Sequence, residues 1–309
     1  MPHLSEQHAY RFIDSHCHLD AQEYGLAEDQ DLIRERARKS GVDLCLIPAV
    51  ERNNFLSVRD LAHRFNDLYA LGIHPLYTTN AKTDDLLYLR AQLTLAKGGS
   101  EMELTENLLK EFPKDPNNLV DQHLVAVGEI GLDGFVKTLD WERQVYFFEE
   151  QLKVAAEFDL PVVLHVRQAV DFVLKGLRKI KVRGGIAHAF NGSAQQAQQF
   201  IDLGFKLGMG GALTYPRALH LRRLVQALPA ESIVLETDSP DIVPAWRYVN
   251  AQQRFEGQAQ ARNEPSELPS IAQEIANIRG EALESLMVQS TQNFLQLFNL
   301  NLPKLNLIH

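Results

Sequence analysis

The chain has 309 residues, 45% of them hydrophobic, and a formal net charge of −9, so it can bury a large core but offers no general positive coat for a polyanion. No apolar run approaches the ~18 residues that a membrane span needs, and the start, MPHLSEQHAY, lacks the positive head and apolar core of a secretory signal. With only two cysteines, Cys17 and Cys45, we expect buried free thiols in a cytoplasmic protein that has no membrane partner.

Eight short apolar runs alternate with amphipathic helical stretches along the chain. The candidate strands are residues 11–15, 43–50, 68–73, 124–128, 161–165, 185–188, 205–208 and 232–236. Helical patterns such as DWERQVYFFEEQLKVAAEF and PRALHLRRLVQAL lie between them. This alternation predicts an α/β fold, a TIM-type (β/α)8 barrel of the metal-dependent hydrolase type. A doubly wound open sheet is the competing arrangement.

Two segments interrupt the alternation. Residues 97–122 are polar and contain Gly-Gly and two prolines, which predicts an insertion before the fourth strand, on the face opposite the carboxyl ends of the strands. Residues 243–265 form a long loop after the eighth strand, and residues 266–299 contain two closing helices. We find no internal repeat and predict one β/α-barrel domain over residues 1–309.

Potential metal ligands occur where the predicted strands end. Because the carboxyl ends of parallel barrel strands meet on one face, these side chains are expected to converge there. Four imidazoles and two carboxylates in one place indicate a metal site, and favour one with two ions. Each residue alone also fits an ordinary structural role, such as a core histidine or a turn-forming aspartate. The six residues are His16 and His18 in HCHLD, Glu129 in VGEIGLD, His165 in LHVR, His188 in AHAF and Asp238 in ETDSPD.

Four further residues near these strand ends are candidates for binding substrate. His74 in GIHP is suited either to contact a phosphate or to fix the turn that follows it. Arg167 is suited to clamp a phosphate or to form a salt bridge with a neighbouring loop. Asn191 and Ser193 open a helix whose free N–H groups favour an anion, although ordinary helix capping uses the same residue types.

The loops after the seventh and eighth strands combine aromatic and arginine side chains. Such interleaving suits stacking on bases and holding the backbone of a single strand, and it equally suits a lid over a small-molecule pocket. By contrast, the run RKIKVR at residues 178–183 leads into the sixth strand and is expected to be a solvated charge run at the opposite end. The loop residues concerned are Tyr215, Arg217, Trp246, Arg247, Tyr248 and Arg254.

Taken together, HCHLD, GIHP, VGEIGLD, HVRQA, HAFNGS and ETDSPD resemble, in this order, the motifs of the TatD family of metal-dependent hydrolases, many of them described as deoxyribonucleases. The resemblance covers nearly the whole chain and implies the barrel of the amidohydrolase superfamily. It implies one divalent ion held by His16, His18, Glu129 and Asp238. A second ion, bridged through Glu129, would be held by His165 and His188. It also implies catalytic roles for Glu129 and for Asp238, the latter as acceptor of a proton from water.

The sequence departs from the family pattern without losing a ligand. Gln168 stands where an acidic residue is usual, Gly134 displaces the aromatic residue that follows GLD to Phe135, and the 97–122 insertion is unusual. Zn²⁺, Mn²⁺, Ni²⁺ and Mg²⁺ all remain open as the two ions, although hard Mg²⁺ fits four imidazoles least well.

Three functions remain open at this point. The first is a deoxyribonuclease that hydrolyses phosphodiester bonds in single-stranded DNA or at DNA ends. The second is a metallohydrolase that acts on a small-molecule or aminoacyl ester or amide, because one barrel supports many chemistries. The third is a non-enzymatic binding protein, which six ligands disfavour because structural sites usually have four. A monomer is the default expectation.

Overall fold

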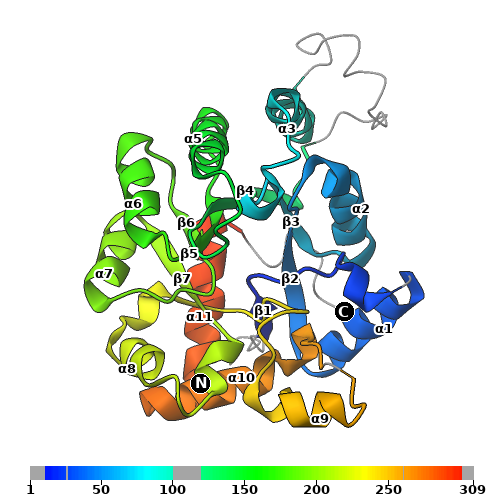
Figure 1. The fold of residues 1–309 in the computed structure, drawn as a ribbon, viewed down its shortest axis with the longest axis vertical. Helices are drawn as coiled ribbons and strands as arrows, with labels where there is room; N and C mark the ends of the chain where they lie inside the picture. The colour runs from blue at the N-terminus through cyan, green and yellow to red at the C-terminus, as the bar shows by residue number, and fades with distance from the viewer. Residues whose placement is uncertain (1–10, 26, 100–119, 260, 301–309) are drawn as a thin grey trace, which may run out of the picture.

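Eight parallel strands form a nearly closed barrel, which confirms the predicted fold class (Figure 1). The computed structural model describes residues 11–25, 27–99, 120–259 and 261–300. Each strand pairs with the next one in sequence order. The strands are β1 (Phe12–Asp14), β2 (Val42–Pro48), β3 (Leu68–Leu71), β4 (Leu124–Asp133), β5 (Val162–Arg167), β6 (Gly185–Ala187), β7 (Phe205–Met209) and β8 (Ile233–Leu235).

Helices surround the strands, as a β/α barrel requires (Figure 1). Their apolar sides pack on the outer face of the strands, where α5, for example, buries Phe147, Phe148 and Leu152. The helices are α1 (Ala27–Lys39), α2 (Phe55–Phe65), α3 (Thr83–Ala96), α5 (Trp141–Glu157), α6 (Val170–Lys179), α7 (Ala194–Asp202), α8 (Leu219–Ala227), α9 (Ala251–Phe255), α10 (Leu268–Arg279) and α11 (Leu283–Phe298). None of these described helices combines the length and apolar character needed to cross a membrane.

The interior of the barrel holds a second, smaller core. Successive strand residues point to opposite faces, so Leu44 and Leu46 of β2 lie inside while Cys45 belongs to the outer core. The last turns of α11 supply Phe294 and Phe298 to the inner core. This packing fills one end of the barrel and leaves the other end for the site.

The seam between β1 and β8 is joined by the segments that follow these two strands. The amide of Asp238 donates to the carbonyl of His16 at 2.9 Å, and the amide of His18 donates to the carbonyl of Ser239 at 2.7 Å. Two motifs more than two hundred residues apart in sequence therefore lie side by side, and each contributes ligand candidates to the same end of the barrel.

The predicted and observed strand boundaries differ by up to two residues, and by five at the end of the fourth strand; two of these differences concern ligand candidates. The fourth strand was predicted to end at Gly128, but β4 continues to Asp133, so Glu129 lies inside a strand. The first strand ends at Asp14, which places His16 just beyond it. Residues 100–119 of the predicted insertion lie outside the described residues; its flanks connect α3 to β4, where the amide of Asp121 donates to the carbonyl of Ala96.

Candidate metal centre

His16 and His18 point to the same side of the segment that follows β1. Their Nε2 atoms lie 3.2 Å apart. Cys17, between them, is turned into the outer core, as the two-residue period of extended backbone requires. The side chain of His16 is completely buried, whereas that of His18 is partly exposed. The pair therefore presents two imidazole nitrogens to one point.

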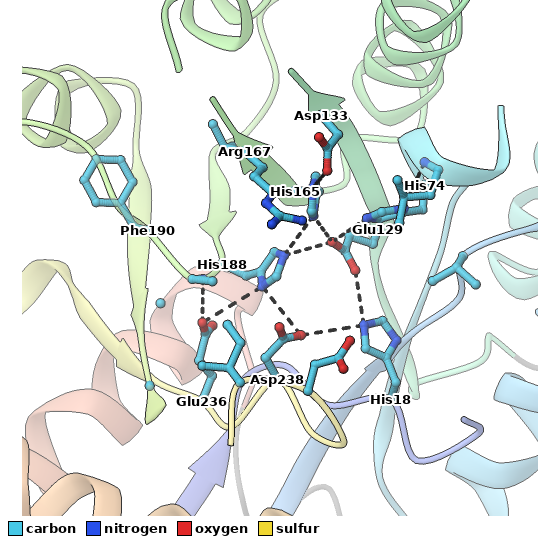
Figure 2. Close-up of a pocket in the computed structure, with 18 of the residues that line it drawn as sticks. His18, His74, Glu129, Asp133, His165, Arg167, His188, Phe190, Glu236 and Asp238 are labelled. Atoms are coloured by element: carbon cyan, nitrogen blue, oxygen red, sulfur yellow. Dashed lines mark hydrogen bonds and ion pairs between the residues drawn. The ribbon is translucent and has the colours of Figure 1, made fainter. Parts of the chain in front are cut away.

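Glu129 and Asp238 complete the first cluster around that point (Figure 2). Glu129 Oε2 lies 3.2 Å from Nε2 of His16 and 3.3 Å from Nε2 of His18. Asp238 Oδ1 lies 3.4 Å and 3.8 Å from the same two nitrogens. Ligands ~2.05 Å from a tetrahedral ion are about 3.3 Å from one another, so this donor set fits one divalent cation.

The other oxygen of Glu129 faces a second cluster (Figure 2). Oε1 lies 2.9 Å from Nε2 of His188 and 3.2 Å from Nδ1 of His165, and these two nitrogens are 3.5 Å apart. Nε2 of His74 lies 3.3 Å from the same oxygen. Glu129 thus joins two groups of imidazoles, one through each oxygen, which is the arrangement of a bridging carboxylate in a two-ion site.

In both clusters, burial and the neighbouring charges shift the pKa values of the ligand candidates in opposite directions. Burial raises the pKa of the Glu129 carboxyl, but His188 and its neighbouring imidazoles hold that pKa well below its ordinary value. Burial lowers the pKa of His188, whereas Glu129 and Asp238 together raise it to about 10. Glu129 therefore stays ionised and draws positive charge to its surroundings. Divalent ions supply that charge while leaving the imidazoles neutral, the form that binds a metal.

Asp238 reaches the first cluster from a turn with an unusual backbone. Its φ of 53° lies in the left-handed region, where aspartate is among the commoner non-glycine residues. Asp14 stabilises this turn, because its carboxylate accepts hydrogen bonds from the Thr237 hydroxyl at 2.5 Å and from the Thr237 amide at 2.9 Å. Burial raises the pKa of Asp14 to about 7. Sequence reasoning missed Asp14, although it is an acidic residue at the end of an apolar run.

Asp133 is a second residue that sequence reasoning missed. Its Oδ2 lies 3.2 Å from Nε2 of His165, on the far side of the ring from Glu129. Its Oδ1 accepts from the amides of Phe135 and Val136, which fixes the carboxylate. Burial raises the pKa of Asp133, but the bond with His165 and these amides lower it below its ordinary value. The clue in the sequence was the aspartate that ends VGEIGLD, four residues after Glu129.

Glu236 is a third residue near the clusters that sequence reasoning missed. Its Oε1 accepts from the Ala189 amide at 2.5 Å and lies 4.0 Å from Nδ1 of His188, so it supports the segment that carries that ligand candidate. Its Oε2 has no hydrogen-bond partner among the described residues, and burial raises its pKa to about 8. A Cβ at Gly208 would lie 2.0 Å from that oxygen, so only glycine leaves it room.

The four predicted substrate-binding residues lie in different settings. His74 fixes its own turn, because Nδ1 accepts from the Leu76 amide at 3.2 Å, and it also reaches Glu129. Asn191 and Arg167 line the cavity over the clusters. Ser193 caps α7 by accepting from the Gln196 amide at 3.1 Å and is not among the cavity-lining residues.

Arg167 has the setting expected of an anion-binding residue. It lies at the end of β5, and its guanidinium stacks over the Phe135 ring at 3.8 Å from the ring centre. It forms no ion pair with any residue that the structure describes. The salt bridge that the sequence left open for Arg167 is therefore absent from the described part of the chain.

A cavity of about 1470 Å³ extends over both clusters. Five of the six ligand candidates line it, and the sixth, His16, lies beneath them. Exposed aromatic side chains, including Tyr77, Phe135 and Phe172, also line this cavity. The arrangement is a metal-binding floor below a wide, partly aromatic opening.

This arrangement has relatives among known proteins. Residues 13–299 match the family model described as TatD related DNase. The chain belongs to the TatD family. It is 36% identical over 291 residues to the "Uncharacterized metal-dependent hydrolase YjjV" of Escherichia coli strain K12, a match that covers 94% of this chain and 98% of the relative.

A solved structure and a further relative extend the comparison. The crystal structure of YjjV, a TatD homologue from Escherichia coli K12, covers 95% of this TatD-family chain and matches along 100% of its own length, with a TM-score of 0.78 and 33% identity. The "3'-5' ssDNA/RNA exonuclease TatD" of Pantoea sp. strain At-9b is 30% identical over 279 residues, or 89% of this chain and 95% of that protein. With its buried ligand clusters, the chain is a metal-dependent hydrolase of the TatD family.

Proposed function

We propose that this TatD-family chain is a deoxyribonuclease that hydrolyses phosphodiester bonds in single-stranded DNA or at DNA ends. The observation that carries the proposal is Glu129, whose two oxygens join two imidazole clusters on the floor of a cavity that also holds Arg167 without an ion-pair partner among the described residues. The exonuclease name of the Pantoea relative supports the same substrate class.

The proposed ligand sets are those that the TatD resemblance implies, and the donor distances are compatible with them. His16, His18, Glu129 and Asp238 would hold one divalent ion, and Glu129, with His165 and His188, would hold the other. When bound, such ions lower the pKa of water and offset the charge that develops on a phosphoryl oxygen. The protein itself keeps the donors in place, through Asp133 behind His165 and Glu236 behind His188.

Asp238 has the proposed role of proton acceptor. Its side chain is 13% exposed and lines the cavity, whereas that of Glu129 is only 2% exposed. Of the two carboxylates, that of Asp238 is therefore the more accessible to a water molecule in the cavity. The turn held by Asp14 and Thr237 keeps the Asp238 carboxylate at that position.

Arg167 has the proposed role of binding a phosphate of the substrate. Its planar guanidinium offers paired N–H donors that match two phosphoryl oxygens, and its stack on Phe135 restricts the plane in which they lie. The cavity exceeds the roughly 300–1,000 Å³ of common small-ligand pockets, which leaves room for more than one nucleotide.

The experiment is hydrolysis of end-labelled single-stranded oligonucleotides by protein loaded with Zn²⁺, Mn²⁺, Ni²⁺ or Mg²⁺. We expect cleavage with at least one of these metals, and a loss of both bound metal and cleavage in Glu129→Gln. Ser193→Ala is the matched control, because Ser193 caps α7 outside the cavity and should leave both unchanged. Intact DNA with every metal, together with turnover of small esters or aminoacyl compounds, would replace this proposal with the alternative metallohydrolase.

A further inference from the structure

A second hollow adjoins the cavity of the metal centre. It has a volume of about 970 Å³ and shares part of its lining with that cavity, including Pro240, Asp241 and Ile242 of the segment just after Asp238. Tyr215, from the segment after β7, lines it together with Tyr248, from the segment after β8. The two cavities are therefore adjacent, and the segment that follows Asp238 lines both of them.

Two tyrosine rings form an aromatic corner in the hollow. The ring centres of Tyr215 and Tyr248 lie 6.0 Å apart, and the planes are inclined by 78°. The Tyr215 hydroxyl donates to the carbonyl of Val243 at 2.8 Å, which holds that ring in place. The side chain of Tyr248 is 43% exposed. A flat ligand can stack on one ring while its edge meets the other.

Two further residues of this loop, Trp246 and Arg247, are occupied elsewhere. Nε1 of Trp246 and a guanidinium nitrogen of Arg247 both donate to the Glu267 carboxylate, at 2.8 Å and 2.7 Å. Arg217, in contrast, is exposed, lies 5.7 Å from the Tyr215 ring centre and pairs with no carboxylate among the described residues. Of the aromatic residues of this loop, Tyr248 lines the hollow, whereas Trp246 is bonded to Glu267 and Phe255 lines neither cavity.

The charges of the lining favour a base over a phosphate. Asp241 and Glu23 line the hollow, and no described residue forms an ion pair with the Asp241 carboxylate. These carboxylates repel a phosphate, but they accept hydrogen bonds from the edge of a base. Arg262 also lines the hollow, but it lies 4.0 Å from the Glu264 carboxylate and donates to the Glu23 carbonyl. Arg217 is therefore the cation proposed for the backbone that leads to the base. A neutral flat ring on a charged backbone matches this combination.

We propose that the hollow binds one unstacked nucleobase of the substrate strand, next to the phosphodiester held at the metal centre, and thereby selects single-stranded nucleic acid. The inference rests on the proposed function for the position of the phosphodiester. A base within a duplex is paired and stacked, so it reaches such a hollow only after it leaves the helix, at a cost that a single strand largely avoids.

The test measures binding of a fluorescein-labelled hexanucleotide with phosphorothioate linkages, which resist hydrolysis, to the metal-loaded protein. One base at a time is removed by placing an abasic site at each position. We expect one position at which removal weakens binding on the order of 10-fold, and Tyr248→Ala should weaken binding of the intact strand by a similar factor. In Tyr248→Ala, the abasic site at that position should cause no further loss.

Two variants are controls for the effect of Tyr248→Ala on binding. Tyr248→Phe keeps the ring and should retain the dependence on the base, and Phe255→Ala removes an 88% exposed aromatic side chain of the same segment that lines neither cavity and should also retain it. Equal binding of every abasic strand, or an unchanged abasic penalty in Tyr248→Ala, would overturn the inference. Hydrolysis of thymidine 4-nitrophenyl phosphate tests the proposed function separately, and its failure would leave the binding result standing.

Discussion

Asp133 Oδ2 lies 3.2 Å from Nε2 of His165, while Nδ1 of the same ring lies 3.2 Å from Glu129 Oε1. An ionised Asp133 only accepts, so the bond places the ring proton of neutral His165 on Nε2. The lone pair on Nδ1 is then directed at the space beside Glu129. A carboxylate behind a histidine in this way fixes the tautomer and the orientation of a metal ligand.

We expect Asp133→Asn to weaken binding of the second ion by about 10- to 100-fold and to leave the first ion in place. Asparagine retains an oxygen that accepts from the Phe135 amide, so the turn should persist. Its amide nitrogen, however, cannot accept the Nε2 proton of His165. Titration of metal-free protein, with elemental analysis, measures both sites; equal affinity for two ions in the variant would contradict the role given to Asp133.

Arg167→Ala should raise the KM for an oligonucleotide by about 10-fold or more with little change in kcat, since a charge-assisted hydrogen bond is lost. Arg167→Lys should reverse only part of this rise in KM, because the single ammonium charge of lysine does not replace the paired N–H donors of the guanidinium group. Metal content should not change. Arg183→Ala is the control, since Arg183 pairs loosely with Asp159 at 4.0 Å on the segment before β6. Equal kinetic effects of the two alanine variants would argue against a phosphate site at Arg167.

Gly208→Ala should destabilise the fold by about 1–3 kcal/mol, because the added Cβ would meet the Glu236 carboxylate at 2.0 Å in a packed interior. Urea denaturation of the metal-free protein measures the free energy of unfolding. Comparison within a Glu236→Ala background identifies the cause: there the penalty of Gly208→Ala should shrink. A penalty of the same size in both backgrounds would mean that the two side chains do not compete for this space.

Asp121, which lies away from the metal centre, should make the free energy of unfolding depend on pH in the acid range. Burial raises the pKa of its carboxyl, but hydrogen bonds from His63, Tyr69 and the His123 amide lower it below the ordinary 3.8. Asp121 therefore binds a proton more readily in the unfolded chain than in the folded one. The stability that ionised Asp121 contributes is present above pH 3.8 and is lost as the pH falls through the folded pKa. Asp121→Asn should unfold more easily at neutral pH, and its deficit should shrink in acid.

The matched control for this pH dependence is Asp60→Asn. The Asp60 side chain is 67% exposed and, among the described residues, forms an ion pair only with the adjacent Arg59, so its substitution should change the free energy of unfolding little at any pH. Urea midpoints of the three proteins across the acid range provide the comparison. A deficit of Asp121→Asn that stays constant as the pH falls would contradict the linkage.

The sequence by itself determined the eight strands and the set of ligand candidates. Alternation of apolar runs with amphipathic helices is a local property, and His16 and His18 are brought to one side by the two-residue period of extended backbone. His188 and Asp238 converge because they follow parallel strands that end on one face of the barrel, and Glu129 and His165 lie within β4 and β5 and reach the same cavity.

Only the tertiary structure decided which side chains support these ligands and which remain available to a substrate. Asp133 faces His165 because β4 continues beyond Glu129 in register with β5, which no local pattern marked. Trp246 and Arg247 resemble base-binding residues in the sequence, but both donate hydrogen bonds to Glu267, which is distant from them in the sequence. Such pairings depend on how loops fold over one another, and because each is a contact between distant residues, residue type and spacing along one chain do not specify it.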